Sequence, residues 1–393
     1  MFPSKQLHRI SRSRITSRTY HELSYAEKGE PFDVLEYFKQ DANLARPVSS
    51  HPDYTIPVQM MHAPWNPADK NKIQGKYPSP QSNPPPQPPS ARANGGDWKV
   101  AGSEGWGHVM DHNGALDSPH LTPGSWVTLG HSGMGTFRSQ LWLPPTAMIP
   151  VERGDELYDS QGPAAASLFQ LGGTAFNMLT EFETLREGSV VVQNAGNSGV
   201  GWMVSQLCKF RQIQVISLVR RGTKTPEEYD LMVNALTENH TNTTRIVAEE
   251  DVLEDKDAFK SLQSGLPNES AVRLGINAVG GPSATLLLRL LAPGGTLVTY
   301  GGMSMKPVTV ATPQLIFRDV NVRGYWHSRW MSQAFVKQKK HLVDQLVDDV
   351  LDHGVQCPPV QVFALSEMKE ALEFELQQSK EAIRRKVVLD CRE

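Results

Sequence analysis

Short apolar runs separated by segments of helical composition dominate the chain after about residue 166. SVVVQN (189–194) and QVISLV (214–219) have the length and β-branched content of buried parallel strands. RIVAEEDV, VRLGINAVGG and GGTLVTYGGM predict further strands. Between the first two runs, Val200, Met203, Val204 and Leu207 recur at helical spacing. This alternation predicts an α/β fold with a doubly wound parallel sheet covered by helices on both faces.

A different pattern covers residues 24–150, where short apolar runs are broken by Gly, Pro and Ser. KVAGSEGWGHVM and TPGSWVTLG are typical of a β-rich, barrel-like unit. After about residue 325 the helical pattern HLVDQLVDDVLDHG leads to a last strand-like run, KVVLD. No internal repeat is visible along the chain.

Composition narrows the class of protein without defining it. The 393 residues are 39% hydrophobic, which favours two or three domains with a packed core. A net charge of -3 gives no reason to expect nucleic acid or an anionic membrane as partner. Cys208, Cys357 and Cys391 lie far apart and form neither a disulfide framework nor a metal motif, so a reducing compartment is expected. No apolar run approaches the roughly 18 residues of a membrane span.

Two segments stand apart from the folded pattern. Residues 1–21 contain five basic residues and four serines but no carboxylate, the composition of an organellar transit peptide, with the mitochondrion ahead of the plastid. The alternative is a disordered basic tail. PSPQSNPPPQPP (78–89) contains seven prolines, which excludes helix and central strand. It predicts an extended surface insertion over residues 78–97.

A glycine-rich turn, QNAGNSGVG (193–201), follows the first predicted strand and precedes an amphipathic helix. Gly196, Gly199 and Gly201 would let backbone N–H groups approach a pyrophosphate at the helix start. The spacing is G-x-x-G-x-G rather than G-x-G-x-x-G, so the context of strand and helix carries the prediction of a dinucleotide site.

The second strand ends in Arg220 and Arg221, where an NAD-binding fold usually offers a carboxylate to the ribose. Two guanidinium groups can bind a 2′-phosphate through charged hydrogen bonds, which predicts a preference for NADP(H). The alternative is a solvated basic turn.

Other stretches are candidates for a ligand cleft. TYGGM (299–303) ends a strand with two glycines that would let a flat ring approach the backbone, and GYWHSRW (324–330) clusters Tyr325, Trp326 and Trp330. The alternatives are an ordinary turn and an aromatic core. His108 and His112 lack the glutamate of HExxH, and no nucleophile motif stands out, so no metal site is predicted.

Residues 66–80, NPADKNKIQGKYPSP, hold one aromatic residue, Tyr77, among turn formers, lysines and amides. A tyrosine on such a loop can be solvated, can pack against a neighbour, or can act as an acid. The segment by itself leaves these three roles open.

The stretches NPADKNKIQGKYP, GSEGWGHV, PGSWVT, QNAGNSGVG, NAVGGPSATLLLRLLAPGGTLVTYGGM and LIFRDVNVRGYWHSRW resemble a known family. They are similar to the zinc-free branch of the medium-chain dehydrogenase/reductases, and within it to the mitochondrial trans-2-enoyl thioester reductases. The resemblance spans nearly all of the chain beyond residue 24. NPxDxxxIQGxY combined with YGGM is fairly specific for the enoyl reductases.

The resemblance implies a GroES-like catalytic domain in two segments, 22–165 and 325–393, around a Rossmann domain at 166–324. It implies a mitochondrial matrix enzyme, a homodimer, that uses NADPH to reduce a trans-2-enoyl thioester carried by acyl carrier protein or coenzyme A. Tyr77 matches the family's proton donor. The positions that match cofactor contacts are Asn197, Ser198, Gly199, Val200, Arg220, Arg221, Tyr300, Gly301, Gly302, Met303, Tyr325, Trp326, His327 and Lys386.

Three departures from the family pattern bear on the site. Gly222 stands where the family has a second basic residue, so Arg221 is a candidate substitute. Leu171 stands where the family has an asparagine, with Gln170 and Thr174 as candidate replacements. The proline-rich insertion follows Tyr77 directly.

Two other functions fit the same residues. One is an NADPH-dependent quinone or alkenal reductase, which shares the framework and the hydride chemistry. The other is a non-catalytic NADPH-binding regulatory protein, which Leu171 would favour.

Overall fold

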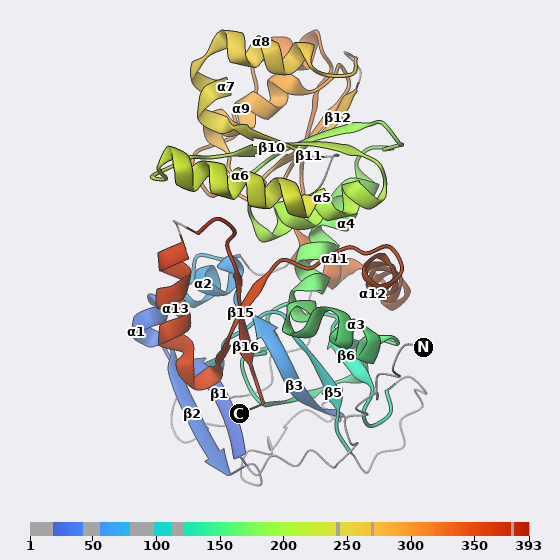
Figure 1. The fold of residues 1–393 in the computed structure, drawn as a ribbon. Coiled ribbons are helices and arrows are strands. Elements are labelled where there is room, and N and C mark those ends of the chain that lie inside the picture. Colours follow the sequence, from blue (N-terminus) through green and yellow to red (C-terminus); the bar gives the residue numbers. More distant parts are fainter. Residues whose placement is uncertain are drawn as a thin grey trace, which may run out of the picture.

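The computed structural model describes residues 19–41, 56–78, 98–111, 121–240, 244–268, 271–378 and 381–392. The chain folds into two lobes, and the first and last described strands both lie in the lower lobe in Figure 1. The upper lobe is formed by a continuous middle part of the sequence. The lower lobe combines the first and last parts.

The upper lobe is built on a six-stranded parallel sheet in the order β11-β10-β9-β12-β13-β14. Its strands are β9 (Val190–Asn194), β10 (Gln214–Val219), β11 (Thr244–Ala248), β12 (Val272–Asn277), β13 (Thr296–Thr299) and β14 (Asn321–Gly324). The chain starts in the middle at β9 and runs outward in both directions, which is the doubly wound arrangement that the apolar runs predicted.

Helices cover both faces of this sheet because neighbouring residues of each strand point to opposite sides. Val191 packs in one core cluster with the helices of the first group, whereas Val190 and Val192 pack with those of the second. The first group is α4 (Gly173–Glu181), α5 (Gly199–Phe210) and α6 (Pro226–His240), and the second is α7 (Glu249–Glu254), α8 (Lys256–Ser264) and α9 (Gly281–Leu290). The short helix α10 (Thr312–Ile316) precedes the edge strand β14.

The lower lobe contains a seven-stranded sheet to which both ends of the sequence contribute. Its order is β15-β16-β3-β5-β6-β8, with β7 also pairing with β3. The strands are β3 (Ile56–Pro64), β5 (Trp106–Val109), β6 (Trp126–Leu129), β7 (Gln140–Leu143), β8 (Met148–Pro150), β15 (Val360–Ala364) and β16 (Lys386–Asp390). The last of these pairs antiparallel with β3, so the C-terminal segment is integral to the N-terminal sheet.

A small sheet and several helices complete the lower lobe. The sheet has the order β2-β1-β4, made of β1 (Thr19–Tyr25), β2 (Glu36–Asp41) and β4 (Lys99–Val100). The helices are α1 (Pro31–Val34), α2 (Pro67–Ile73), α3 (Gly154–Gln161), α11 (His327–Gln333), α12 (Val336–Leu351) and α13 (Met368–Gln377). Short 3-10 turns cover Pro145–Ala147, Gly162–Ser167 and Leu365–Glu367, and a single π-helical turn, Leu168–Gly172, leads into α4.

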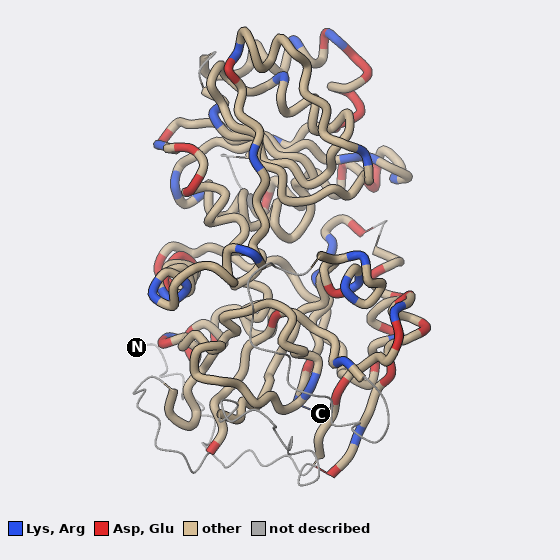
Figure 2. The backbone as a smooth tube through the Cα atoms, turned by 180° about the vertical axis from the view of Figure 1, so that it is seen from behind, with Lys and Arg blue, Asp and Glu red and all other residues tan. Residues whose placement is uncertain are grey.

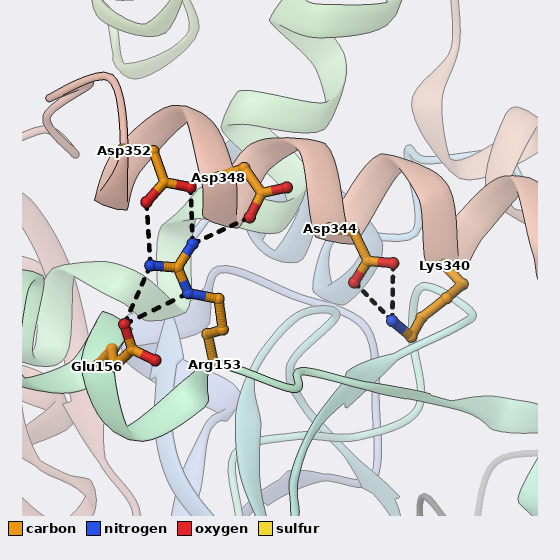
Figure 3. A network of polar contacts seen from close by, with 6 residues as sticks. All are labelled: Arg153, Glu156, Lys340, Asp344, Asp348 and Asp352. Carbon is orange, nitrogen blue, oxygen red and sulfur yellow. Dashed lines mark hydrogen bonds and ion pairs between the residues drawn. The ribbon is translucent and has the colours of Figure 1, made fainter.

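Arg153 ties the two parts of this lobe together at the surface (Figure 3). Its guanidinium contacts Asp352 at 2.7 Å and Asp348 at 3.2 Å, and Glu156 at 3.0 Å, while Lys340 pairs with Asp344 on the same helix. Because these groups are largely exposed, solvent screens the contacts, and burial of α12 rather than ion pairing holds the segments together. Charged residues of both signs are scattered over both lobes (Figure 2).

The structure differs from the sequence prediction in three places. The basic segment was predicted to end at residue 21, but Thr19–His21 belong to β1, where Tyr20 and His21 are buried. RIVAEEDV is a strand only as far as Ala248, since its three acidic residues open α7, where carboxylates favour a helix start. Edge strand β14 was not predicted, because a four-residue exposed strand has no apolar pattern.

Some predictions fall outside the described residues, including most of the proline-rich insertion, residues 1–18, and His112. Within the described ranges, none of the helices combines the length and apolar character needed to cross a membrane. The same ranges contain no group of three or more His, Cys, Asp or Glu side chains arranged to hold a metal ion.

Candidate active site

Tyr77 owes its position to the short helix α2. Asn66 and Asp69 form a capping box at the helix start, with the Asn66 N–H donating to the Asp69 carboxylate at 2.9 Å. Gly75 adopts a φ of 70° directly after the helix, a conformation that glycine reaches without strain. The N–H of Tyr77 then donates back to the Asn71 carbonyl at 3.1 Å. The motif thus fixes the tyrosine backbone one turn beyond the helix.

The Tyr77 hydroxyl lies against a residue 249 positions away in the chain. The indole Nε1 of Trp326 donates to the Tyr77 oxygen at 2.7 Å, and the two rings meet edge to face with centroids 5.9 Å apart. Because an indole N–H can only donate, the phenol oxygen accepts this bond and keeps its own proton for another partner. Trp326 lies between β14 of the upper lobe and α11 of the lower lobe, so the contact is made at the junction of the two lobes.

The predicted glycine turn lies between β9 and α5, at the carboxyl end of the parallel sheet. A side chain at Gly196 would lie 2.5 Å from Ser217 Cβ, and one at Gly201 would lie 2.6 Å from the Ala195 carbonyl oxygen. The backbone is therefore packed too closely for any other residue at these two points. Ser198 caps α5 by accepting from the Gly201 N–H at 3.1 Å. This cradle at the start of a 12-residue helix suits a pyrophosphate.

Around this turn the predicted contact residues take different positions. The Asn197 amide is directed to the sulfur of Met232 at 3.6 Å, and Val200 packs against the core. Tyr300 contacts Ser198 of this turn. Burial raises the pKa of Tyr300 to about 12, and its hydrogen bond with Ser198 opposes the shift. Tyr300 stays protonated at neutral pH.

Leu171 lies directly over the first turn of α5. Its Cδ1 would be 2.8 Å from a side-chain carbon at Gly199, so a hydrocarbon covers the place where the family pattern has an amide. Of the two candidate replacements, Thr174 is already used, because its hydroxyl donates to the Gln170 carbonyl at 2.6 Å. Gln170 contacts Glu104 through its backbone N–H at 2.7 Å, which leaves its side-chain amide as the candidate replacement.

The two arginines after β10 differ in their surroundings. Arg221 binds the Asp251 carboxylate through both terminal nitrogens, one at 2.7 Å, and its guanidinium lies 5.2 Å from the Tyr229 ring centre. Arg220 is exposed, and its side chain makes no hydrogen bond or ion pair within the described part of the chain. Arg220 is therefore the guanidinium available to a 2′-phosphate.

The second glycine corner follows β13. A side chain at Gly301 would lie 2.9 Å from the Ala278 carbonyl oxygen, whereas one at Gly302 would meet no atom within 4 Å. Met303, next in the chain, is 67% exposed. The corner is thus open at Gly302, as a close-lying flat ring requires.

Tyr325 and His327 point away from Tyr77, although Trp326 between them reaches it. The Asn177 amide donates to the Tyr325 oxygen at 2.9 Å, and the Tyr325 hydroxyl shares a hydrogen bond with His327 Nδ1, also at 2.9 Å. Burial lowers the pKa of His327 to about 4, so the ring is neutral at pH 7. These two side chains anchor α11 to α4. Asn177 gave no signal in the sequence.

Lys386 begins β16 and belongs to a buried polar group under α2. Burial lowers its pKa, and Glu104, Glu375 and Asp69 oppose that shift. Glu104 accepts from the Asn66 amide at 3.0 Å, and burial raises its pKa to about 7 against the hydrogen bonds from Gln170 and Asn66. The sequence noted GSEG but could not place Glu104, because its partners come from distant segments.

Comparison with solved structures identifies the fold. The complex of Etr1p with NADP and crotonyl-CoA matches with a TM-score of 0.78 at 24% identity, over 95% of this chain and 99% of that one. The mitochondrial 2-enoyl thioester reductase Etr1p/Etr2p heterodimer from Candida tropicalis gives the same values. A putative NADPH:quinone reductase from Bacillus thuringiensis matches at 0.73 and 20% identity, over 95% and 99% of the two chains. The fold is that of the medium-chain dehydrogenase/reductases.

Sequence relatives narrow this class. The mitochondrial enoyl-[acyl-carrier-protein] reductase of Bos taurus is 35% identical over 355 residues, 90% of this chain and 85% of the relative. That of Dictyostelium discoideum is 34% identical over 382 residues, 95% of each chain. No family model matches the chain. The chain belongs to the family of mitochondrial enoyl-[acyl-carrier-protein] reductases.

Proposed function

We propose that this protein reduces trans-2-enoyl thioesters with NADPH in mitochondrial fatty acid synthesis, and that Tyr77 is the proton donor. Family membership supports the reaction class, and its relatives are named mitochondrial. The contact that carries the proposal is the hydrogen bond from Trp326 to Tyr77, because it leaves the phenol proton free at the junction of the two lobes.

The residues present fit NADPH. The cradle at Gly196 and Gly201 suits the pyrophosphate, exposed Arg220 suits the 2′-phosphate, and the open backbone at Gly302 suits the nicotinamide ring. Bound NADPH supplies the hydride that adds to the β-carbon of the enoyl thioester. An NAD-specific site would instead offer a carboxylate after β10.

Tyr77 completes the reduction at the other carbon. Hydride addition makes the substrate an enolate, whose α-carbon requires a proton. The Tyr77 O–H gives that proton and becomes a phenolate. The Trp326 N–H, already directed at this oxygen, strengthens as a hydrogen-bond donor when the oxygen becomes negative.

The substrate test is NADPH oxidation with crotonyl-CoA compared with benzoquinone. We expect turnover to butyryl-CoA with the thioester and little with the quinone. Faster reduction of benzoquinone would assign the chain to the quinone reductase chemistry that shares its fold. Binding of NADPH with no turnover of short or long enoyl thioesters would indicate a non-catalytic role.

A homodimer is the second part of the proposal. Edge strand β14 is exposed at all four residues and leaves a row of backbone groups open for pairing. Beside it lie exposed apolar side chains, with Ile316 66% and Phe317 79% accessible. An open strand edge flanked by apolar surface is what two copies would cover by antiparallel pairing.

Sedimentation of Phe317→Glu tests this interface. We expect the wild type to sediment as a dimer and the variant as a monomer at micromolar concentration. Leu231→Glu, at an exposed position on α6, in another part of the chain, is the matched control and should remain dimeric. A Phe317→Glu variant that remains dimeric would contradict the proposed interface.

A further inference from the structure

A lysine amine lies close to the ring of Tyr77. Lys72 Nζ is 5.4 Å from the centre of the Tyr77 ring. It donates to Ser103 Oγ at 2.8 Å and to Ser132 Oγ at 3.1 Å, so it is held in one place rather than extended into solvent. A side chain at Gly133 would lie 3.1 Å from Nζ, which shows how closely the 132–133 loop covers the amine.

The charge of this amine is balanced through a hydrogen-bonded chain. Ser103, which accepts from Lys72, donates its own hydroxyl proton to the Asp69 carboxylate. Asp69 is 1% exposed and also caps α2. Burial lowers the pKa of Lys72, and Asp69 opposes that shift. The arrangement therefore holds the positive charge of Lys72, a residue of α2, beside the Tyr77 ring.

Fixing and partly desolvating the Lys72 ammonium costs free energy. A lysine on the outer turn of α2 could reach water at little cost, as exposed Lys70 and Lys76 do. Lys72 instead orders a flexible side chain and loses hydration to contact two serines. Packing alone would be served as well by an apolar side chain of the same length.

We propose that Lys72 is the counter-charge of Tyr77, and that its ammonium stabilises the tyrosinate formed when Tyr77 protonates the substrate. This inference rests on the proposed function of Tyr77. Trp326 contacts the phenol oxygen from the junction of the two lobes, and Lys72 supplies positive charge from α2. Because Lys72 acts through Tyr77, it is a positioning residue. No bond to Lys72 forms or breaks; the proton that Tyr77 gives up is recovered from solvent.

Other charges face this segment and bear on the test. Lys28 lies beside Gly75, and Lys76 precedes Tyr77, but both are exposed and screened by water. Asp69 lies behind Ser103, and Glu104 and Lys386 lie behind Asn66. Their effects are common to the variants compared below.

The experiment compares Lys72→Met and Lys72→Arg in the full chain, each also in the Tyr77→Phe background. Turnover of crotonyl-CoA is measured at saturating NADPH. We expect Lys72→Met to lose about tenfold in kcat, equal to about 1.4 kcal/mol, with the KM for NADPH unchanged. Lys72→Arg should stay within about threefold of wild type, since it keeps the charge. The solvent deuterium isotope effect on kcat should rise in Lys72→Met, because proton transfer becomes slower.

The double-mutant cycle decides whether Lys72 acts through Tyr77 or has only a structural role. In the Tyr77→Phe background, Lys72→Met should have no further effect on kcat, because no tyrosinate forms. A tenfold loss in both backgrounds would reduce Lys72 to a structural role, and wild-type kcat in Lys72→Met would overturn the proposal. Lys72→Gln, which removes the charge but keeps a polar group that can donate, carries the same expectation if the methionine variant does not fold. Tyr77→Phe with full activity would instead refute the proton donor, and with it this inference.

Discussion

The glycine turn at 193–201 and the tyrosine segment at 66–77 are the two halves of the proposed site, and they are built by different means. The turn is local: its strand, tight backbone and helix lie within about 20 residues of one another. The tyrosine segment fixes its own backbone through α2, but its hydroxyl receives its partner from 249 residues away. The predicted pyrophosphate turn is thus contained in one stretch of sequence, whereas the proposed acid depends on a contact between segments that lie far apart in the chain.

Gly201→Ala tests the local part, and its effect on NADPH should be the largest of those compared here. The added methyl would lie 2.6 Å from the Ala195 carbonyl oxygen, and backbone there cannot move aside cheaply. We expect at least a hundredfold weaker NADPH binding by fluorescence titration, on the scale of a severe backbone substitution. Gly265→Ala, where the methyl meets the flexible end of Arg245, is the matched control and should bind normally. Normal binding in Gly201→Ala would show that the pyrophosphate does not sit on this turn.

Trp326→Phe tests the contact at the junction of the two lobes. It keeps an aromatic ring beside Tyr77 and removes the N–H that donates at 2.7 Å. A hydrogen bond to a developing charge contributes roughly 1.5–3 kcal/mol, so kcat should fall about ten- to a hundredfold. The dissociation constant for NADPH should change less than kcat. The reverse pattern, with binding lost and kcat kept, would mean that the tryptophan serves the cofactor rather than the tyrosine.

Arg220→Ala and Arg221→Ala sharpen the local prediction, because the sequence could not separate these neighbours. Arg220 is free to bind a 2′-phosphate, whereas Arg221 is bound to Asp251. Steady-state kinetics should show a KM for NADPH raised about tenfold in Arg220→Ala, with the KM for NADH little changed. Arg221→Ala should leave both constants nearly as they are. Equal effects in the two variants would contradict this division.

Glu104→Gln tests the buried polar group beneath α2 through the pH dependence of stability. Its pKa is raised from the ordinary 4.5 to about 7, so the folded state binds the extra proton between these values. The contribution of Glu104 to stability is therefore largest below about pH 4.5 and declines as pH rises to about 7. Relative to wild type, Glu104→Gln should flatten this decline in denaturant titrations between pH 5 and 7. Parallel stability curves for the two proteins would mean that Glu104 does not bind the proton. Histidines with lowered pKa values are present in both proteins, so their contribution cancels in the comparison.

The sequence predicted the local features of both regions. The runs 189–194 and 214–219 became β9 and β10, KVVLD became β16, and the glycine turn lies where expected. Resemblance rather than periodicity pointed to the two-segment lower lobe, since no local pattern reports that β16 pairs with β3. Edge strand β14 escaped prediction because it is short and exposed.

The finer chemistry of the site could not be predicted, because it depends on distant partners. The link from Asn177 through Tyr325 to His327 spans more than 140 residues, and the Glu104 contacts join Asn66 to Gln170. Lys72 looked like one of several lysines on a polar helix until Ser103 and Ser132 were found to hold it. Catalytic roles at Tyr77 and the cofactor positions remain predictions that the variants above address.

The central claim is that the phenol of Tyr77 delivers a proton, and Tyr77→Phe tests it most directly. The substitution keeps the ring beside Trp326 and removes the hydroxyl, which carries the proton and accepts the Trp326 hydrogen bond. With saturating NADPH and crotonyl-CoA, kcat should fall roughly 10²–10⁴-fold, the usual scale for a general acid, while NADPH affinity stays as in the wild type. A kcat near the wild-type value would contradict the account and leave Tyr77 as a packing residue beside the cofactor.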